Sequence, residues 1–335
     1  MIERTVVQRL PAWEWLGIVC VIAGEALLAT GWRPGVDFYF PVVWYGYILT
    51  LDGALFRMAG TSILRRSPLL FALMIPVSAA CWWIFELFDA AVGSWRYIGA
   101  GPYSGAAFVV LATVSFSTVL LAVWETAMCA SYGLQWLLTP AGRSPRLVTA
   151  VRRLTTYPAG WANHRQSDGA RRERMLMIAT FLLGLASILL PLRWPEYFFP
   201  LLWVALFFLL DPLNFWLGRP SILHQLWRGH RQTAASFALG ALICGFFWES
   251  WNYWAPIKWV YSVPYVSQWH LFEMPVPGYG GYVPFGLELY AMAVFALWPL
   301  RRWGRLGREP FPMVDEERDE EPELGVRTPR ARVSA

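Results

Sequence analysis

The sequence predicts an all-α, polytopic membrane protein with about eight transmembrane helices, arranged as a tandem, parallel duplication of a four-helix unit. Three observations predict this fold: an apolar composition, arginine-rich loops that alternate with basic-poor ones, and an internal repeat. Of the 335 residues, 56% are hydrophobic and only 15% are charged, whereas a soluble domain carries about 25% charged residues. The 21 tryptophans also favour a membrane setting, because an indole satisfies both its apolar ring and its N–H donor at the interface.

Eight apolar segments are long enough to span a bilayer, or nearly so. The fourth is long for one helix, and a re-entrant piece at 104–119 followed by a helix is the alternative. The loop 255–282 has too many prolines and glycines for a span, yet it is too apolar for a solvated loop. We expect it to lie at the interface or to fold back over the outer ends of the helices. The eight predicted spans are 14–31, 39–57, 68–90, 106–138, 175–193, 197–217, 233–254 and 283–300.

Arginine-rich loops follow the second, fourth, sixth and eighth segments, and the loops between them carry few basic residues. Because basic loops stay on the cytoplasmic side of a membrane, both termini are predicted to be cytoplasmic, in a bacterial inner membrane. The eight arginines of 139–174 are expected to face anionic lipid and not nucleic acid. The tail 309–335 is rich in Asp, Glu, Pro and Arg and is expected to be disordered.

An internal repeat relates the two halves of the chain. Phe40-Pro41-x-x-Trp44 recurs 159 residues later as Phe199-Pro200-x-x-Trp203. Four spans in each half return the chain to the same side, so the halves share one orientation and a pseudo-twofold axis is expected along the membrane normal. The matched pairs further include Asp52 with Asp211, Glu86 with Glu249, Asp89 with Asn252, Trp95-x-Tyr97 with Trp259-x-Tyr261, and Glu125 with Glu288. The predicted units are a first repeat (1–138), a basic linker (139–174), a second repeat (175–308) and the tail (309–335).

The predicted orientation sorts the intramembrane acids into two layers. A charged side chain at the bilayer centre costs roughly 2.5–3.5 kcal/mol on the insertion scale, so each such acid is a candidate functional residue. A protonated carboxylic acid in a dry, aromatic-lined pocket can donate a proton, whereas the structural alternative is that these acids only hydrogen-bond the helices together. The outer-layer candidates for acid catalysis are Glu249, Glu288, Glu86 and Glu125; the candidates for substrate binding are Asn252, Asp89, Trp248, Trp251, Trp259, Tyr261 and Tyr282.

The inner layer consists of Asp52, Asp211 and Asn214. Each aspartate lies near the cytoplasmic end of its span, with Arg57 or Arg219 close by in sequence. A helix cap or an ion pair is the favoured interpretation of these aspartates, and a path for cations or protons is the alternative.

Metal and cofactor sites are not predicted. The four cysteines lie far apart in apolar runs, a pattern that fits neither a disulfide framework nor a thiolate site. His270 and Glu273 are two potential ligands without a third, and no histidine lies within a predicted span, which argues against bis-histidine haem. The sequence also lacks a P-loop, a dinucleotide-binding glycine motif and a nucleophile elbow.

One part of the second repeat has a recognisable layout. Trp248-Glu249 ends a span, Trp259-Val260-Tyr261 with Pro264 follows, and Pro284-Phe285-Gly286-Leu287-Glu288 opens the next span. The first half echoes it with Phe88-Asp89, Trp95-Arg96-Tyr97 and Glu125. This layout resembles membrane lycopene cyclases of the bacterial and archaeal type, although that family has adjacent glutamates where this chain has Leu287-Glu288, and an aspartate where it has Glu249.

The resemblance implies a proton-initiated cyclisation or hydration of a carotenoid or other prenyl chain. It implies Glu249 and Glu288 as the acids, and Trp and Tyr faces that stabilise a carbocation. The sequence as a whole therefore predicts an outer-leaflet pocket, lined by carboxylates and tryptophans, for a prenyl-, carotenoid- or lipid-like molecule, with membrane lipids as the other partners. Whether the protein is an enzyme stays open, and the rival classes are a proton- or cation-coupled transporter or channel and a non-catalytic membrane scaffold.

Overall fold

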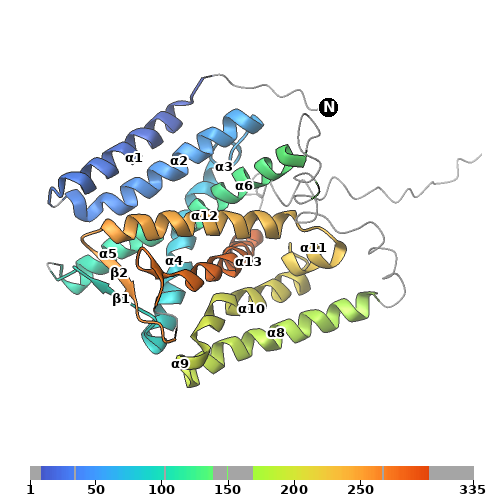
Figure 1. Cartoon of the computed structure of the whole chain (residues 1–335). Helices are drawn as coiled ribbons and strands as arrows, with labels where there is room; N and C mark the ends of the chain where they lie inside the picture. The colour runs from blue at the N-terminus through green and yellow to red at the C-terminus, as the bar shows by residue number, and fades with distance from the viewer. Residues whose placement is uncertain are drawn as a thin grey trace, which may run out of the picture.

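The computed structural model describes residues 9–33, 35–101, 103–138, 149, 169–265 and 268–301. These residues are mostly helical (Figure 1). The predicted disordered tail and most of the predicted basic linker lie outside the described residues. The helices of the first half are α1 (Ala12–Thr30), α2 (Tyr39–Ala59), α3 (Ile63–Arg66), α4 (Pro68–Val92), α5 (Gly105–Phe116) and α6 (Val119–Leu138). Those of the second half are α8 (Gly169–Arg193), α9 (Pro195–Phe198), α10 (Leu202–Trp216), α11 (Ile222–Arg228), α12 (Gln232–Trp254) and α13 (Tyr282–Arg301), and the short 3-10 turns are η1 (Gly35–Phe38), η3 (Phe199–Leu201) and η4 (Val276–Gly281).

Seven helical segments among the described residues are long and apolar enough to cross a membrane. They include α1, α4, α8 and α12, the run from α5 into α6, and the runs that end in α10 and α13. The fold is therefore that of a multi-pass helical membrane protein, as the composition predicted. Helix α2, predicted as a span at 39–57, has 21 residues but is not among the seven, because Asp52, Arg57 and its tyrosines lower its hydropathy.

The long helices pack partly against their chain neighbours and partly against helices far away in the sequence. Helix α1 lies along α2 at one edge of the molecule, α8 lies along α10 at the opposite edge, and α12 and α13 lie between them (Figure 1). Helix α6 packs on α12 and joins the halves. The largest buried side chains are aromatic and include Trp44, Trp124 and Phe85.

Two helix crossings depend on the absence of a side chain. A Cβ atom added at Gly286 of α13 would lie 2.2 Å from the carbonyl oxygen of Phe237 in α12. One added at Gly240 of α12 would lie 2.8 Å from the backbone nitrogen of Ala127 in α6. Such close backbone approach is how membrane helices gain packing energy without a hydrophobic driving force between them.

The predicted fourth span is two helices. Helix α5 ends at Phe116 and α6 begins at Val119. Ser78 of α4 bridges the break, because its Oγ donates to the carbonyl oxygen of Phe116 at 2.6 Å and accepts from the backbone N–H of Leu120 at 2.9 Å. A buried serine thus satisfies the backbone groups that the break exposes.

The all-α prediction missed a short antiparallel ribbon. Strand β1 (Trp95–Ile98) pairs with β2 (Lys258–Tyr261), so a loop of each half contributes one strand. A second pair, β3 (His270–Leu271) and β4 (Met274–Pro275), follows in the loop that was expected to fold back. The ribbon and α5 lie at one end of the helices, and α3 and α11 lie at the other end (Figure 1).

Asp52 caps the short helix α3, at the end of the molecule opposite the ribbon. Its Oδ1 accepts from Ser62 Oγ at 2.7 Å and its Oδ2 accepts from the backbone N–H of Leu64 at 2.9 Å. This is the cap that the sequence favoured, since a carboxylate stabilises unpaired N–H groups at a helix start. Arg57, the predicted ion-pair partner, instead binds Glu14 of α1 at 2.7 Å.

Asp211 makes the same kind of cap for α11. It accepts from Ser221 Oγ at 2.7 Å and from two backbone N–H groups of the α11 start at 2.8 and 2.9 Å. Asn214, the third inner-layer residue, donates from Nδ2 to a backbone carbonyl of α13 at 3.0 Å. All three polar residues of the inner layer therefore hold helices together.

Candidate functional site

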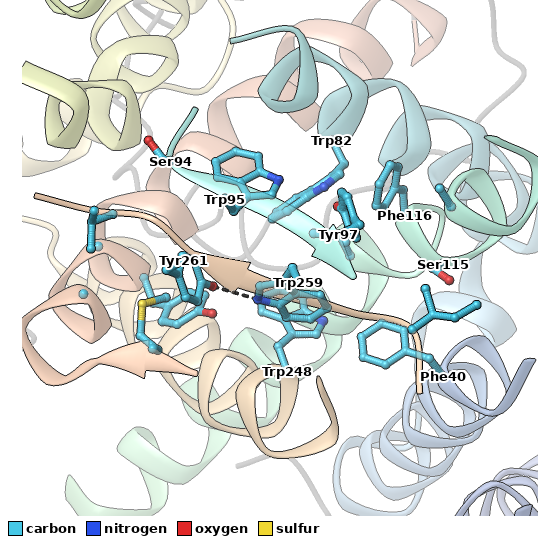
Figure 2. A pocket seen from close by; sticks show the side chains of 18 of the residues that line it. Phe40, Trp82, Ser94, Trp95, Tyr97, Ser115, Phe116, Trp248, Trp259 and Tyr261 are labelled. Atoms are coloured by element: carbon cyan, nitrogen blue, oxygen red, sulfur yellow. Dashed lines mark hydrogen bonds between the residues drawn. The ribbon is translucent and has the colours of Figure 1, made fainter. Parts of the chain in front are cut away.

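A cavity of about 450 Å³ lies at the ribbon end of the helices (Figure 2). Its wall is mostly aromatic and apolar, and both halves of the chain contribute to it. Cavities of roughly 300–1,000 Å³ are typical of sites for small organic molecules. The aromatic wall includes Phe40, Trp82, Trp95, Tyr97, Trp248 and Trp259.

The carboxylate of Glu86 lies behind the cavity wall of the first half. Its Oε1 accepts from Trp82 Nε1 at 2.9 Å, from Tyr97 OH at 2.6 Å and from Trp95 Nε1 at 3.4 Å. Trp82 lies four residues before Glu86, and this spacing puts both on one face of α4. All three donors line the cavity, whereas Glu86 does not. The acid therefore orients an aromatic wall and does not itself form the surface.

Glu249 has the corresponding position in the second half. Its Oε1 accepts from Tyr261 OH at 2.6 Å and from Tyr282 OH at 2.7 Å, and Trp259 Nε1 donates to Tyr261 OH at 2.9 Å (Figure 2). The side chain is fully buried, and its Oε2 accepts no hydrogen bond from a described residue. Both phenols line the cavity, so Tyr261 and Tyr282 lie between the Glu249 carboxyl and the space.

The two ribbon tyrosines remain hydrogen-bond donors over the accessible pH range. Burial, with a smaller contribution from Glu86, raises the pKa of Tyr97 well above 10. Burial, with a smaller contribution from Glu249, raises the pKa of Tyr261 in the same way. Each phenol therefore keeps its proton and directs it at the carboxylate behind it.

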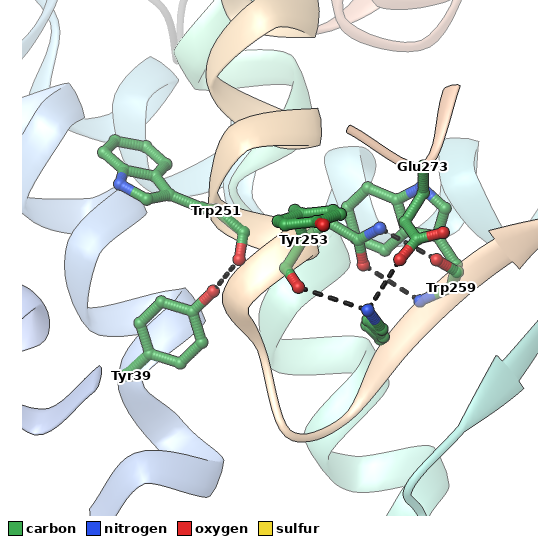
Figure 3. Close-up of polar contacts among 7 residues, drawn as sticks. Tyr39, Trp251, Tyr253, Trp259 and Glu273 are labelled. Carbon is green, nitrogen blue, oxygen red and sulfur yellow. Dashed lines mark hydrogen bonds and ion pairs between the residues drawn. The ribbon is translucent and has the colours of Figure 1, made fainter. Parts of the chain in front are cut away.

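Asp89 and Asn252 fix the chain where it leaves α4 and α12. Asp89 Oδ1 accepts from the backbone N–H groups of Ser94 at 2.6 Å and Trp95 at 3.2 Å. Asn252 accepts from the backbone N–H of Trp259 at 2.9 Å and donates to its carbonyl at 2.8 Å (Figure 3). Neither side chain lines the cavity. These predicted binding residues thus place the ribbon, and the ribbon in turn places the aromatic rings.

The other two predicted acids lie away from the cavity. Both oxygens of Glu125 are buried and accept no hydrogen bond from a described donor group, but the carboxyl lies close enough to the Asp52 carboxyl for the two to share a proton. Glu288 Oε1 accepts from the backbone N–H of Leu206 in α10 at 2.9 Å, and its Oε2 has no described partner. The four glutamates therefore do not converge: Glu86 and Glu249 back the cavity wall, and the other two lie within the helix packing.

Trp251, another predicted binding residue, faces α1. Its Nε1 donates to Glu25 at 2.7 Å, and its carbonyl oxygen accepts from Tyr39 OH (Figure 3). Trp251 does not line the cavity. The other predicted aromatic residues, namely Trp248, Trp259, Tyr261 and Tyr282, do line it.

The loop that follows α12 folds back along the cavity. Met274 and Gly278 line the space, and Lys258 Nζ ties the loop by binding Glu273 at 2.6 Å and the carbonyl of Tyr253 at 3.2 Å (Figure 3). Glu273, considered above as a weak metal ligand, thus has a lysine partner. Within the described residues no group of three or more His, Cys, Asp or Glu side chains could hold a metal ion.

Among the lining residues that were not singled out from the sequence are Trp82, Phe116 and Asp37. Trp82 could have been found, because it lies one helical turn from Glu86. Phe116 could not, because it enters the wall only where α5 breaks from α6. Asp37 is the third and is the only acidic residue among the described lining residues.

Comparisons of this chain with protein-family models, with curated proteins and with solved structures find no match. The features of this chain that bear on function are the cavity and the carboxylates behind its aromatic wall. The likeness to membrane lycopene cyclases rests on the residues quoted for it.

Proposed function

We propose that this protein is an eight-span membrane protein that binds a hydrophobic molecule, of prenyl-, carotenoid- or lipid-like kind, in the aromatic cavity. The observation that carries the proposal is a space of about 450 Å³ lined by indole, phenol and phenyl rings of both halves, together with small and aliphatic residues. Aromatic and aliphatic walls of this kind bind apolar ligands by surface burial. Flat π faces also suit unsaturated chains, since they stack on or meet them edge to face.

Helix α5 supports access from the lipid. One of its faces lines the cavity through Phe108 and Leu111, while Val110 on another face is 64% exposed. In a bilayer such an exposed apolar face would contact acyl chains. A single helix therefore separates the cavity from lipid, and a molecule dissolved in the membrane needs no aqueous route.

The arginine pattern supports an outer-leaflet position for the cavity. Arg65 and Arg66 lie in α3 and Arg228 lies in α11, at the end opposite the ribbon (Figure 1). Because basic residues favour the cytoplasmic side, the ribbon and the cavity would face outward, in a bacterial inner membrane with both termini inside.

The two halves repeat their contacts, which supports a duplication. Each capping aspartate accepts from a serine hydroxyl ten residues later and from a backbone N–H twelve residues later. The ribbon pairs Trp95 with Tyr261 and Tyr97 with Trp259. If each residue is replaced by its counterpart in the other half, the same two pairs result. This is expected for a twofold axis that passes through the Arg96–Val260 pair.

Acid catalysis is the narrower proposal, and Glu249 is its best candidate. A proton from this carboxyl would reach the cavity by way of Tyr282, which binds Glu249 and lines the space. The Tyr282 hydroxyl donates to Oε1 in the structure, so the transfer requires this hydroxyl to turn its own proton into the cavity and to accept the proton of the protonated carboxyl in its place. The fully buried Glu288 contacts α10 and has no such route in the described structure. Of the two acids that the resemblance implies, cyclisation or hydration of a prenyl chain would therefore use Glu249 and not Glu288.

A proton or cation path through the inner layer has less support. The carboxylates of Asp52 and Asp211 are occupied by helix-capping hydrogen bonds. Releasing them to carry an ion would unpair helix starts. A scaffold role would leave the enclosed aromatic space without an occupant.

The binding proposal is tested by what purifies with the protein. The full chain is purified in mild detergent, extracted, and analysed by mass spectrometry for isoprenoids and lipids. The matched pair is Gly280→Trp and Gly133→Trp, because a Cβ atom added at either glycine meets no atom within 4 Å. Gly280 lines the cavity, whereas Gly133 lies exposed on α6 and away from it.

The wild-type protein and Gly133→Trp should retain one enriched class of hydrophobic molecule, and Gly280→Trp should lose most of it. An equal content in all three proteins, or no enrichment over another membrane protein purified in the same way, would contradict the proposal.

A further inference from the structure

We propose that the molecule bound in the cavity carries a hydroxyl group at one end and that this hydroxyl donates a hydrogen bond to Asp37. This inference rests on the proposed function, because it concerns the occupant of the same cavity. It narrows the ligand from any hydrophobic molecule to a neutral, long-chain alcohol of prenyl-like form.

Asp37 is a buried acceptor with unused capacity. It lies in η1, directly before α2, and it lines the cavity. The residue is 9% exposed. Its Oδ2 accepts from Tyr103 OH at 2.7 Å, while its Oδ1 is buried and accepts no hydrogen bond from a described residue. A carboxylate oxygen has room for two hydrogen bonds, and a buried acceptor left unpaired costs free energy.

Tyr103 holds the carboxylate without filling the vacant position. The hydrogen bond to Asp37 raises the pKa of the Tyr103 hydroxyl, so the phenol stays a donor to Oδ2. This contact fixes the rotation of the carboxylate, and Oδ1 is the oxygen left without a hydrogen bond from a described residue. The arrangement resembles the way in which enzymes position an acceptor before a ligand arrives.

The charge near Oδ1 favours a neutral donor over a cationic one. Arg33 Nε lies 3.7 Å from Oδ1, too far for a hydrogen bond but close enough to balance the negative charge. An ammonium group at Oδ1 would meet this guanidinium, and like charges at such a distance repel. An alcohol gains the hydrogen bond without that repulsion.

The rest of the cavity suits the apolar remainder of such a molecule. Asp37 lies three residues before Phe40, whose ring lies on the opposite side of Trp259 from Tyr261 (Figure 2). Tyr261 and Tyr282 already use their protons on Glu249. The space thus offers one vacant carboxylate position at the Phe40 side and aromatic faces beyond it.

Two probes that differ in a single donor test the proposal. Farnesol and farnesyl methyl ether share the chain, but only farnesol can donate a hydrogen bond. Their binding to the full-length protein, delipidated in detergent, is followed by intrinsic tryptophan fluorescence. Wild-type protein should prefer farnesol by roughly 10- to 100-fold, the range expected for a hydrogen bond to a charged acceptor.

Asp37→Leu should remove this preference and leave the affinity for the ether nearly unchanged. Asp37→Asn serves as the second variant if the leucine protein does not fold, because it keeps the shape; its amide can donate to the ether oxygen, so the two probes should bind about equally. Glu173→Gln is the matched control, since Glu173 is a carboxylate of α8 that binds His224 of α11 and does not line the cavity. It should keep the wild-type preference.

The outcomes separate the two proposals. Equal binding of both probes by wild-type protein would overturn the role of Asp37 while the binding function stands. Tighter binding of farnesylamine than of farnesol would overturn the neutral-alcohol assignment. Binding of none of the probes, with the cavity emptied of its native occupant, would overturn both the alcohol and the proposed function.

Discussion

Replacing Glu249 with glutamine should leave the protein folded, whereas replacing it with leucine should lower the free energy of unfolding. Glutamine keeps an oxygen that can accept from Tyr261 and Tyr282, which now donate to Oε1 at 2.6 and 2.7 Å. Only Oε2, which has no described partner, is replaced by the NH2 group of the amide. Leucine removes the acceptor of both buried hydroxyls at once.

The size of the difference follows from these contacts. A buried donor that loses its acceptor costs about 1–3 kcal/mol, so Glu249→Leu should cost about 2–5 kcal/mol when both phenols are counted and some relaxation is allowed. Glu249→Gln should cost under about 1 kcal/mol, because it exchanges one unpaired polar atom for another. Tyr282→Phe removes one of two donors and should fall between them.

Thermal unfolding in detergent, followed by tryptophan fluorescence, gives the order of stability. We expect wild type and Glu249→Gln to unfold at similar temperatures, Tyr282→Phe below them, and Glu249→Leu lowest. A glutamine variant as unstable as the leucine variant would refute the hydrogen-bond argument. With an identified substrate, Glu249→Gln also separates roles: a folded protein that binds but forms no product supports acid catalysis, and full product formation excludes it.

Two further predictions concern the caps and the ribbon. Asp211→Ala should lower the unfolding temperature, because it leaves Ser221 Oγ and two backbone N–H groups of the α11 start without their acceptor; an unchanged unfolding temperature would contradict this prediction. The ribbon should lose stability only at alkaline pH: the raised pKa values of Tyr97 and Tyr261 contribute stability that is fully present below the unfolded pKa of about 10 and is lost as the pH rises through the folded value. These two tyrosines should therefore leave the unfolding temperature unchanged from pH 6 to 9 and lower it above pH 10. The fall above pH 10 should be smaller in Tyr261→Phe. An equal fall in that variant would refute the contribution of Tyr261.

The spans could be placed from the sequence because lipid imposes a simple requirement. A segment in hydrocarbon must be apolar and must satisfy its own backbone, so hydropathy alone gave 233–254 for a helix that covers Gln232–Trp254. The cap at Asp211 was also foreseeable. An aspartate near the predicted cytoplasmic end of a span, ten residues before a serine, has few other partners in its surroundings.

The ribbon was not foreseeable, because its two strands lie more than 150 residues apart and each has only four residues. A strand of that length has no detectable period, and its backbone bonds are made only when the two loops meet. The same pairing decides the site. Asp89 and Asn252 bind the backbone of the two strands and do not line the cavity. The pairing also turns Trp95 and Tyr97 toward Glu86.

The sequence by itself determined that the chain is a multi-pass helical membrane protein, and it identified the buried carboxylates and the indoles around Trp248, because burial of charge and apolar length are properties of local sequence. Only the tertiary structure decided which of these residues enclose a common space. The four glutamates have matching positions along the chain, yet Glu86 and Glu249 back the cavity whereas Glu125 and Glu288 lie within the helix packing. The depth of a side chain in the bundle, and the direction in which it points, depend on how the helices cross. The spacing of residues along one helix does not determine this.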